Sequence, residues 1–235
     1  MTPPLNVHVF GIAPYAEVWA LQEQLADARL AGRVPDSLLL LEHPPTITLG
    51  RRGSLADVYA SPEALARRGV TVERTSRGGL VTFHGPGQLV GYPIVHLRGL
   101  GRTVPAYVHG LESAMVRALS GFGIAAWEDT EHPGVWTAGG KVAAIGIAQR
   151  RGVTLHGFAL NVDPDLSYFE LINPCGLGGL GVTSIARLVA RPPTLAAVRR
   201  SLVRCLIDEF GWSGEEDHGI VPPLDTISVP EIQPN

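Results

Sequence analysis

The hydrophobic and polar positions of this chain follow two different periods, which predict a mixture of helices and strands. Apolar residues recur at helical spacing in residues 15–30, 103–119 and 194–212, and a Ser-Pro start favours a shorter helix over 61–68. Thr103 is the expected N-cap of the helix over 103–119, and Pro105 falls in its first turn.

Shorter apolar or alternating runs predict the strands. They are expected at residues 6–10, 37–41, 79–84, 89–95, 124–127, 135–136, 141–149, 153–162 and 182–188, with one more after Pro45 and a short helix over 165–171. A Gly-Pro-Gly turn joins strands 79–84 and 89–95 and leaves His84 at its edge. Arg150-Arg151-Gly152 is expected to close a hairpin between strands 141–149 and 153–162.

Length, composition and charge limit the possible classes of protein. At 235 residues and 45% hydrophobic content, we expect one domain over residues 1–212 and a loosely held, acidic, proline-containing tail over 213–235. The net charge is -3, but residues 1–212 carry 19 Lys and Arg against 17 Asp and Glu, which argues against a general nucleic-acid binder. With two cysteines, no signal-like start and no apolar run near the ~18 residues of a membrane helix, a reducing cytoplasm is the expected location.

Lysine is almost absent from the chain. Lys141 is the only one, and every other basic residue that is not a histidine is an arginine. An ammonium, unlike a guanidinium, gives up its proton readily when it is desolvated. Two glycines precede Lys141 and an apolar run follows it, so we expect it to be half-buried and to serve chemistry. The alternative is an exposed lysine beside a Gly-Gly turn.

The two cysteines stand in different surroundings. Cys205 falls near the apolar stripe of the last helix and is expected to be a small core residue. Cys175 stands in Asn-Pro-Cys-Gly, a loop suited to presenting a side chain. A nearby ammonium lowers the pKa of a thiol. Lys141 and Cys175 are therefore candidates for a base and nucleophile pair.

Four motifs together resemble the lipoyl(octanoyl) transferase family over about residues 35–188. They are Arg77 to Gln88 with Tyr92-Pro93, Gly140 to Gly146, His156 to Asn161, and Asn173 to Gly176. The resemblance implies the α/β (α+β) fold of the biotin and lipoate protein ligases, a mixed, largely antiparallel sheet packed with helices. It also implies transfer of an octanoyl group from octanoyl-acyl carrier protein to a lysine of a lipoyl domain, the first step of protein lipoylation. Acceptors in such families are the lipoyl domains of 2-oxoacid dehydrogenase complexes and the glycine cleavage H protein.

The resemblance also implies roles for individual residues. Cys175 would be the acyl-thioester nucleophile and Lys141 the residue that lowers its pKa. The acyl site would be lined by Arg77, Gly78, Gly79, Leu80, Val81, Thr82, Phe83, His84, Ala144, Ile145, Gly146, Gly157, Phe158 and Ala159. The preferred acyl-chain length stays open. Because a thioester already carries the energy for amide formation, no metal or other cofactor is expected.

Three other readings of these residues remain open. An ATP-dependent acyl-protein ligase of the same fold could hold phosphate at Arg51 and Arg52, and would not need Cys175. A non-catalytic acyl-carrier or lipoyl-domain binding module would use the glycine-rich strands only as a groove. A cysteine hydrolase would need His84 or His156 as its base, yet neither has an evident acidic partner, and His84 could equally be structural.

Overall fold

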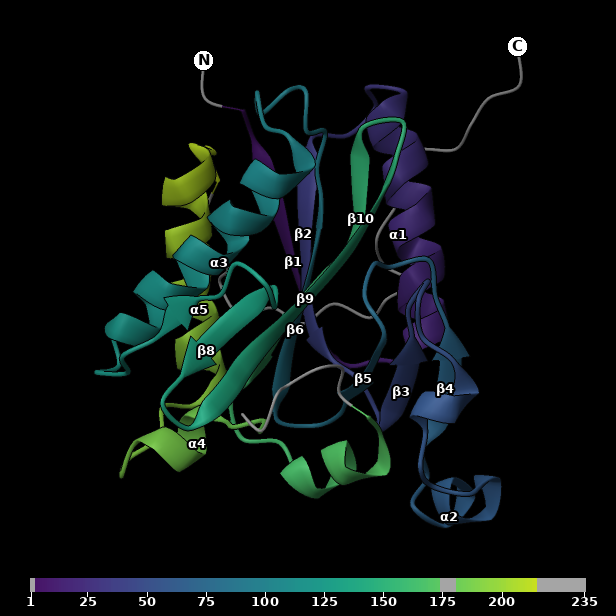
Figure 1. The fold of residues 1–235 in the computed structure, drawn as a ribbon. Helices are drawn as coiled ribbons and strands as arrows, with labels where there is room; N and C mark the ends of the chain where they lie inside the picture. Colours follow the sequence, from purple (N-terminus) through teal and green to yellow (C-terminus); the bar gives the residue numbers. More distant parts are fainter. Residues whose placement is uncertain (1–2, 174–180, 215–235) are drawn as a thin grey trace.

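The described part of the structure, residues 3–173 and 181–214 of a computed structural model, is built on a seven-stranded sheet (Figure 1). Its strands, in spatial order, are β1 (Leu5–Ile12), β2 (Asp36–Glu42), β6 (Gln88–Ile94), β10 (Val153–Asn161), β9 (Gly140–Arg150), β8 (Gly134–Thr137) and β7 (Trp127–Glu128). The pair β1 and β2 is parallel, and all other neighbours are antiparallel. The expected mixed, largely antiparallel sheet is confirmed.

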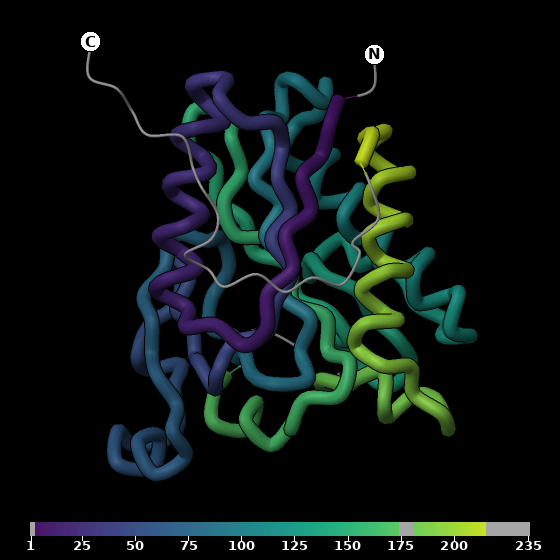
Figure 2. Tube along the Cα trace, turned by 180° about the vertical axis from the view of Figure 1, so that it is seen from behind, coloured from purple at the N-terminus to yellow at the C-terminus, as the bar shows by residue number. Residues whose placement is uncertain are grey.

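Helices cover both faces of this sheet because its central strands are apolar on both sides. In β2, Leu38 and Leu40 point into one core, and Leu39 and Leu41 point into the other. The first core is closed by α3 (Val104–Ser120) and α5 (Leu195–Phe210), and the second by α1 (Tyr15–Leu30). Figures 1 and 2 show α1 on the opposite side of the sheet from α3 and α5.

A second sheet of three strands lies beside the first within the described residues. It contains β4 (Thr71–Arg74), β3 (Thr46–Leu49) and β5 (Val81–His84), in that order. Its small core holds Phe83, whose ring stacks on Tyr168 with centroids 4.7 Å apart. The two strands joined by the Gly-Pro-Gly turn therefore belong to different sheets, and the turn carries the chain from the small sheet to the large one.

The predicted helices form, and Thr103 is the N-cap of α3 (Val104–Ser120), as expected. Thr103 accepts a hydrogen bond from the Ala106 N–H, and Ser61 caps α2 (Pro62–Arg67) in the same way. The remaining short helices are η1 (Leu55–Asp57), η2 (Leu166–Leu171) and α4 (Ile185–Leu188). The strand predicted over 182–188 is wrong: only Val182 pairs, with Lys141, before the chain turns into α4.

Both the hairpin and the start of the predicted tail are described. Arg151 and Gly152 take positive φ angles of 52° and 88° in the turn that joins β9 to β10. Ser213 is hydrogen-bonded to Pro3 and Leu5 beside the first strand, so the chain is held at the point where the tail was expected to begin. Residues 215–235 lie outside the described residues.

Candidate active site

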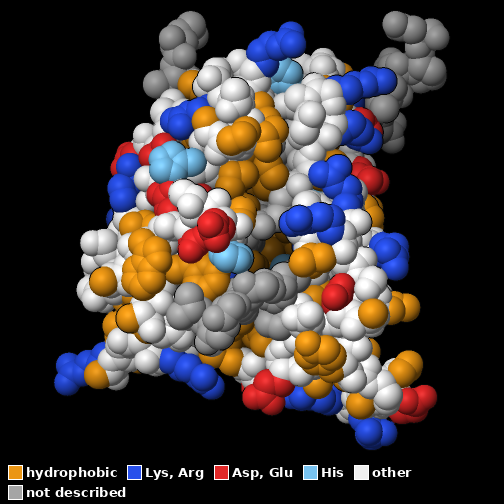
Figure 3. All heavy atoms as spheres, viewed as in Figure 1, with side chains coloured by type: hydrophobic (Ala, Val, Ile, Leu, Met, Phe, Trp, Pro, Cys, Tyr) orange, Lys and Arg blue, Asp and Glu red, His pale blue; other side chains and the backbone are white. Residues whose placement is uncertain are grey.

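A cavity of about 480 Å³ opens between the two sheets. Its walls come from β5, β6, β9 and β10 and from the segment between β4 and β5. Figure 3 shows this face hollowed near its centre, with hydrophobic side chains visible inside the hollow and basic side chains beside it. A mostly apolar cavity of this size with a few polar groups is typical of a small-molecule site.

The cavity brings together almost all of the residues predicted to bind the acyl group. Its lining includes Lys141 and every predicted residue of the sets 77–82, 84, 144–146 and 157–159. Phe83 is the exception, because strand alternation turns its side chain into the small core, where it is 1% exposed. Tyr15, Tyr92 and Asn161 also line the cavity and were not among the predicted acyl-site residues, although Tyr92 and Asn161 lie in the motifs that carry the family resemblance. Tyr15 was assigned to the apolar face of a helix, and that pattern alone does not distinguish a core from a cavity wall.

Arg77 stands at the closest approach between the small sheet and β9. Its guanidinium is buried and donates to the carbonyl and hydroxyl oxygens of Thr48, and the Gly78 N–H donates to the Ile147 carbonyl at 2.8 Å. A Cβ added to Gly146 would come within 3.0 Å of the Gly78 carbonyl oxygen and 3.1 Å of Arg77 Cδ. Gly146 therefore permits the two walls to meet.

His84 is held by side chains on both of its ring nitrogens. Its Nδ1 lies 2.8 Å from the Gln88 Oε1, and its Nε2 lies 3.3 Å from the Thr48 hydroxyl. The Gln88 amide nitrogen donates to Asn161, whose own amide donates to the Thr183 carbonyl. Since the Gln88 oxygen can only accept, His84 carries a proton on Nδ1. Burial and the nearby charge of Arg77 hold the pKa of His84 well below its usual value.

Two further histidines in this region are also neutral at pH 7. Burial lowers the pKa of His43 and of His156 to about 4, and the charge of Arg77 adds to the effect on His156. His156 lies 3.2 Å from the Tyr15 hydroxyl and 2.9 Å from the Ser76 hydroxyl. Among the described residues no carboxylate contacts His84 or His156, so neither has the acidic partner that a hydrolase base requires.

Lys141 lies at the opposite wall, near the start of β9. Its side chain is half-buried, as expected, and its Nζ lies 5.2 Å from the centre of the Trp136 ring. Its backbone is fixed on both sides: the N–H donates to the Gly181 carbonyl, and the carbonyl accepts from the Thr183 N–H. On β8, Trp136 pairs with Lys141 and Val135 with Ala143, so Val142 is an extra residue in a β-bulge. The bulge sets the direction of Lys141 separately from the rest of the strand.

Of the two cysteines, the structure describes only Cys205. Cys175 lies outside the described residues, which stop at Asn173 and resume at Gly181. The Asn173 N–H donates to the Asp57 carbonyl on the small-sheet side, and Gly181 bonds to Lys141. Cys205 packs against the core of α3 and α5, half-buried rather than fully buried, and burial raises the pKa of its thiol.

In the described residues, no helix is long and apolar enough to cross a bilayer.

A lipoate protein ligase and a biotin protein ligase of known structure share this fold. The bipartite lipoate protein ligase of Thermoplasma acidophilum superposes with a TM-score of 0.73 at 17% identity, covering 92% of this chain and 87% of that one. The biotin protein ligase of Aquifex aeolicus, solved with biotin and ATP, gives 0.55 at 13% identity over 88% and 70%. At such identities the likeness shows a shared fold alone, and it confirms the expected fold class.

Sequence comparison is more specific. Residues 14–207 match the family of the lipoyl protein ligase A/B catalytic domain. The octanoyltransferase of Chloroflexus aggregans is 48% identical over 209 residues, which cover 88% of this chain and 95% of the relative. The chain belongs to the lipoyl protein ligase A/B catalytic domain family, as one of its octanoyltransferases.

Proposed function

We propose that this chain transfers an octanoyl group from octanoyl-acyl carrier protein to a lysine of a lipoyl domain, through a thioester on Cys175. The observation that carries the proposal is the identity of 48% with an octanoyltransferase over nearly its whole length. The cavity supports this proposal, because Lys141 lies in one of its walls and its mostly apolar lining suits an alkyl chain. Burial of that chain contributes about 0.8 kcal/mol per methylene.

The first half-reaction forms the acyl-thioester. Lys141 takes the proton of the Cys175 thiol, and the thiolate attacks the octanoyl carbonyl. As the new C–S bond forms, the bond to the carrier's sulfur breaks, and the Lys141 ammonium returns its proton to that leaving thiolate. The negative oxygen of the tetrahedral intermediate needs N–H donors, for which the backbone near Cys175 and Gly176, or near Gly78 and Gly79, is a candidate. Of these, the Gly78 N–H already donates to the Ile147 carbonyl.

The second half-reaction forms the amide. The neutral amine of the acceptor lysine attacks the thioester carbonyl, and the Cys175 thiolate leaves. Lys141, now neutral, accepts the proton that the attacking nitrogen loses, and then passes it to the thiolate. No step uses ATP, because the thioester supplies the free energy. The acceptors would be lipoyl domains of 2-oxoacid dehydrogenase complexes and the glycine cleavage H protein, and a reducing cytoplasm would keep the thiol reduced.

The covalent step is tested by intact-mass spectrometry of the protein mixed with octanoyl-acyl carrier protein without ATP. We expect the wild type to gain one octanoyl group that hydroxylamine removes, and Cys175→Ser to gain none. Cys205→Ser is the matched control and should still be acylated. If the wild type gains no adduct, and a lipoyl domain is acylated only with free octanoate and ATP, the ligase alternative is favoured instead.

A further inference from the structure

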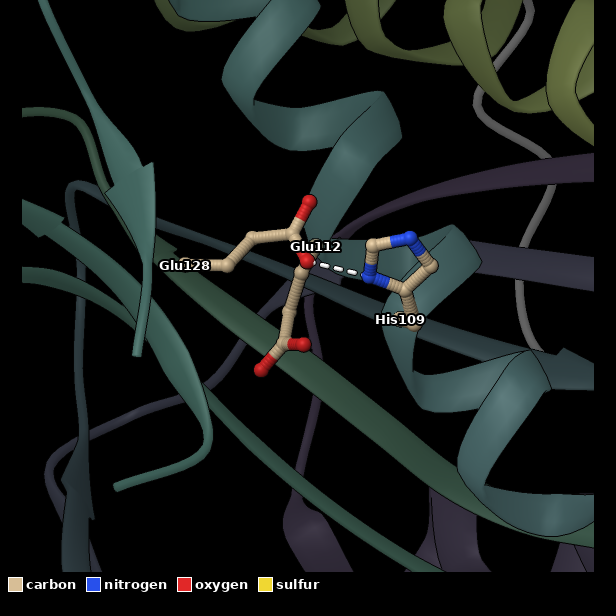
Figure 4. Close-up of side chains that lie close together, drawn as sticks. All are labelled: His109, Glu112 and Glu128. Atoms are coloured by element: carbon tan, nitrogen blue, oxygen red, sulfur yellow. Dashed lines mark hydrogen bonds and ion pairs between the residues drawn. The ribbon is translucent and has the colours of Figure 1, made fainter. Parts of the chain in front are cut away.

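A buried carboxylate lies behind the wall that carries Lys141. Glu112 stands on the apolar face of α3, between Leu111 and Met115, and is only 6% exposed. Figure 4 shows it with His109, from the same helix, beside Glu128 from β7. One nitrogen or oxygen from each of the three side chains lies within 4.8 Å of the others, and His109 is paired with Glu128. Burial of a carboxylate costs free energy of folding unless the group is hydrogen-bonded or paired with a positive charge.

Glu112 bonds to the strand beside Lys141. Its Oε1 accepts a hydrogen bond from the Gly134 N–H, with the two atoms 2.6 Å apart. Gly134 opens β8, whose next residues pair with the start of β9. The carboxylate thus fixes the backbone of Gly134, which pairs with Ala144 close to the bulge between Val135 and Trp136.

The Lys141 side chain runs directly over Gly134. A Cβ added at Gly134 would lie 2.5 Å from Lys141 Cε and 3.1 Å from its Nζ, and Gly134 has a φ of 132°. Only a glycine leaves this path open. One residue's backbone therefore separates the Glu112 carboxylate from the aliphatic chain that carries the ammonium.

The charges around Glu112 favour a coupling to Lys141. Burial raises the pKa of Glu112; the bond from Gly134 lowers it, the charge of Glu128 raises it, and His109 and Lys141 lower it. If the Lys141 ammonium stabilises the carboxylate, the carboxylate stabilises the ammonium by the same free energy.

We propose that Glu112, acting through Gly134, is a positioning residue that fixes the direction of the Lys141 side chain and stabilises its protonated form. The inference rests on the proposed function only in the use that it assigns to Lys141. The geometry and the charge of Lys141 can be tested without any octanoyl transfer.

The composition of the chain makes that test unusually direct. Because Lys141 is the only lysine, protein labelled with ¹³C,¹⁵N-lysine gives a single set of side-chain NMR signals. Titration of the Cε signal then reports the pKa of this one residue. Glu112→Gln keeps an oxygen that can accept the hydrogen bond from Gly134 but removes the negative charge. Glu112→Asp keeps the charge on a side chain that is one methylene shorter. Glu17→Gln, at an exposed position in α1, is the control.

We expect Glu112→Gln to lower the pKa of Lys141 by roughly half a unit or more, and Glu17→Gln to leave it unchanged. Glu112→Asp should shift the Lys141 signals with a smaller change of pKa. In Glu112→Gln, the pH at which the transfer rate falls on the alkaline side of its pH profile should decrease by the same amount as the pKa of Lys141 measured by NMR. An unchanged Lys141 titration in folded Glu112→Gln would overturn the proposal, as would a wild-type titration that changes with EDTA, which would indicate a cation at the three side chains.

The NMR titration and the intact-mass experiment together separate this proposal from the proposed function. If the wild type gains no octanoyl adduct, the acyl-thioester mechanism is contradicted, whereas the effect of Glu112 on the Lys141 titration can still be observed. A normal adduct with no effect of Glu112 on Lys141 would contradict only the positioning role.

Discussion

The two walls of the cavity hold their charges in opposite ways. At the wall of Arg77, each polar group has a fixed partner: the guanidinium binds Thr48, and His84 is held between Thr48 and Gln88. At the wall of Lys141, an ammonium lies over an indole ring, with a buried carboxylate behind the neighbouring strand. The first arrangement keeps His84 neutral near pH 7, and the second holds the side chain that is proposed to move a proton. A site for acyl transfer needs both, a rigid surface to hold the chain and one group whose proton can move.

The largest effect is expected where the mobile proton is removed. Lys141→Arg keeps a positive charge but gives a group that does not lose its proton near neutral pH, so the transfer rate should fall roughly 10²- to 10⁴-fold. Single-turnover transfer measures this loss. Titration of the Cys175 thiol in a Cys205→Ser background would show whether a positive charge at position 141 is enough to lower the pKa of that thiol. Full activity in Lys141→Arg with a normal thiol titration would exclude a proton-transfer role.

The buried, neutral histidines should make the fold sensitive to acid. His43 and His156 have pKa values near 4 when folded and near 6.5 when unfolded, so the unfolded chain binds more protons between these values. The free energy of unfolding should therefore decrease as pH falls from about 6.5 to 4, by roughly 2 to 6 kcal/mol in total. Denaturant unfolding at several pH values measures the slope. The slope should become shallower in His43→Gln and His156→Gln; equal slopes in these variants would contradict the assignment.

A smaller loss is expected when the rigid wall loses its central hydroxyl. Thr48→Val keeps the side-chain shape but removes an acceptor of Arg77 and a partner of His84, leaving buried groups unsatisfied. We expect about 1 to 3 kcal/mol of destabilisation. Thr71→Val, at an exposed position in the same small sheet, is the control and should change the free energy of unfolding by less than about 0.5 kcal/mol. Equal midpoints of denaturation for the two variants would show that the Thr48 contacts are not important for stability.

The smallest effect is expected on the rate of association with the carrier protein, from the arginines at the rim of the cavity, Arg51 and Arg52. Arg51 and Arg52 are exposed, and Arg52 borders the cavity. Reversing both to Glu should slow association with an acidic carrier protein several-fold at low salt, with the difference shrinking as salt rises. The reversal of Arg191 and Arg200, which are exposed elsewhere, makes the same change of net charge. If both double variants slow association equally, the rim arginines have no local role.

Local sequence patterns predicted what depends on neighbours in the chain. The helix over 15–30 has the expected limits, and the hairpin closed at Arg151 and Gly152, because periodicity and turn residues act over a few positions. The half-burial of Lys141 also followed from the glycines before it and the apolar run after it. In contrast, the split between two sheets arises because β3 pairs with β4 and β5, a choice made by distant partners.

Several differences between prediction and structure concern the face of an element on which a residue lies. Phe83 lies within a predicted binding motif, but its position in β5 turns it into the small core. Glu112 interrupts the apolar face of a predicted helix, a signal that was available, although only the packing of β8 against α3 shows what the charge contacts. Residues 182–188 are apolar enough for a strand, yet after Val182 no partner strand lies beside them in the described structure.

Because of the bulge at Val142, the position of Lys141 depends on the number of residues in this segment of β9. Substitutions of the apolar residues after Lys141 would change packing, but deletion of one residue between Lys141 and Ala143 would remove the extra position opposite Trp136 and restore an uninterrupted ladder. The ammonium would then be displaced by about 3.3 Å along the strand relative to the rest of the cavity wall. Insertions and deletions in this segment should therefore be far less tolerated than exchanges of its side chains, which makes segment length a constraint as strict as the presence of the lysine.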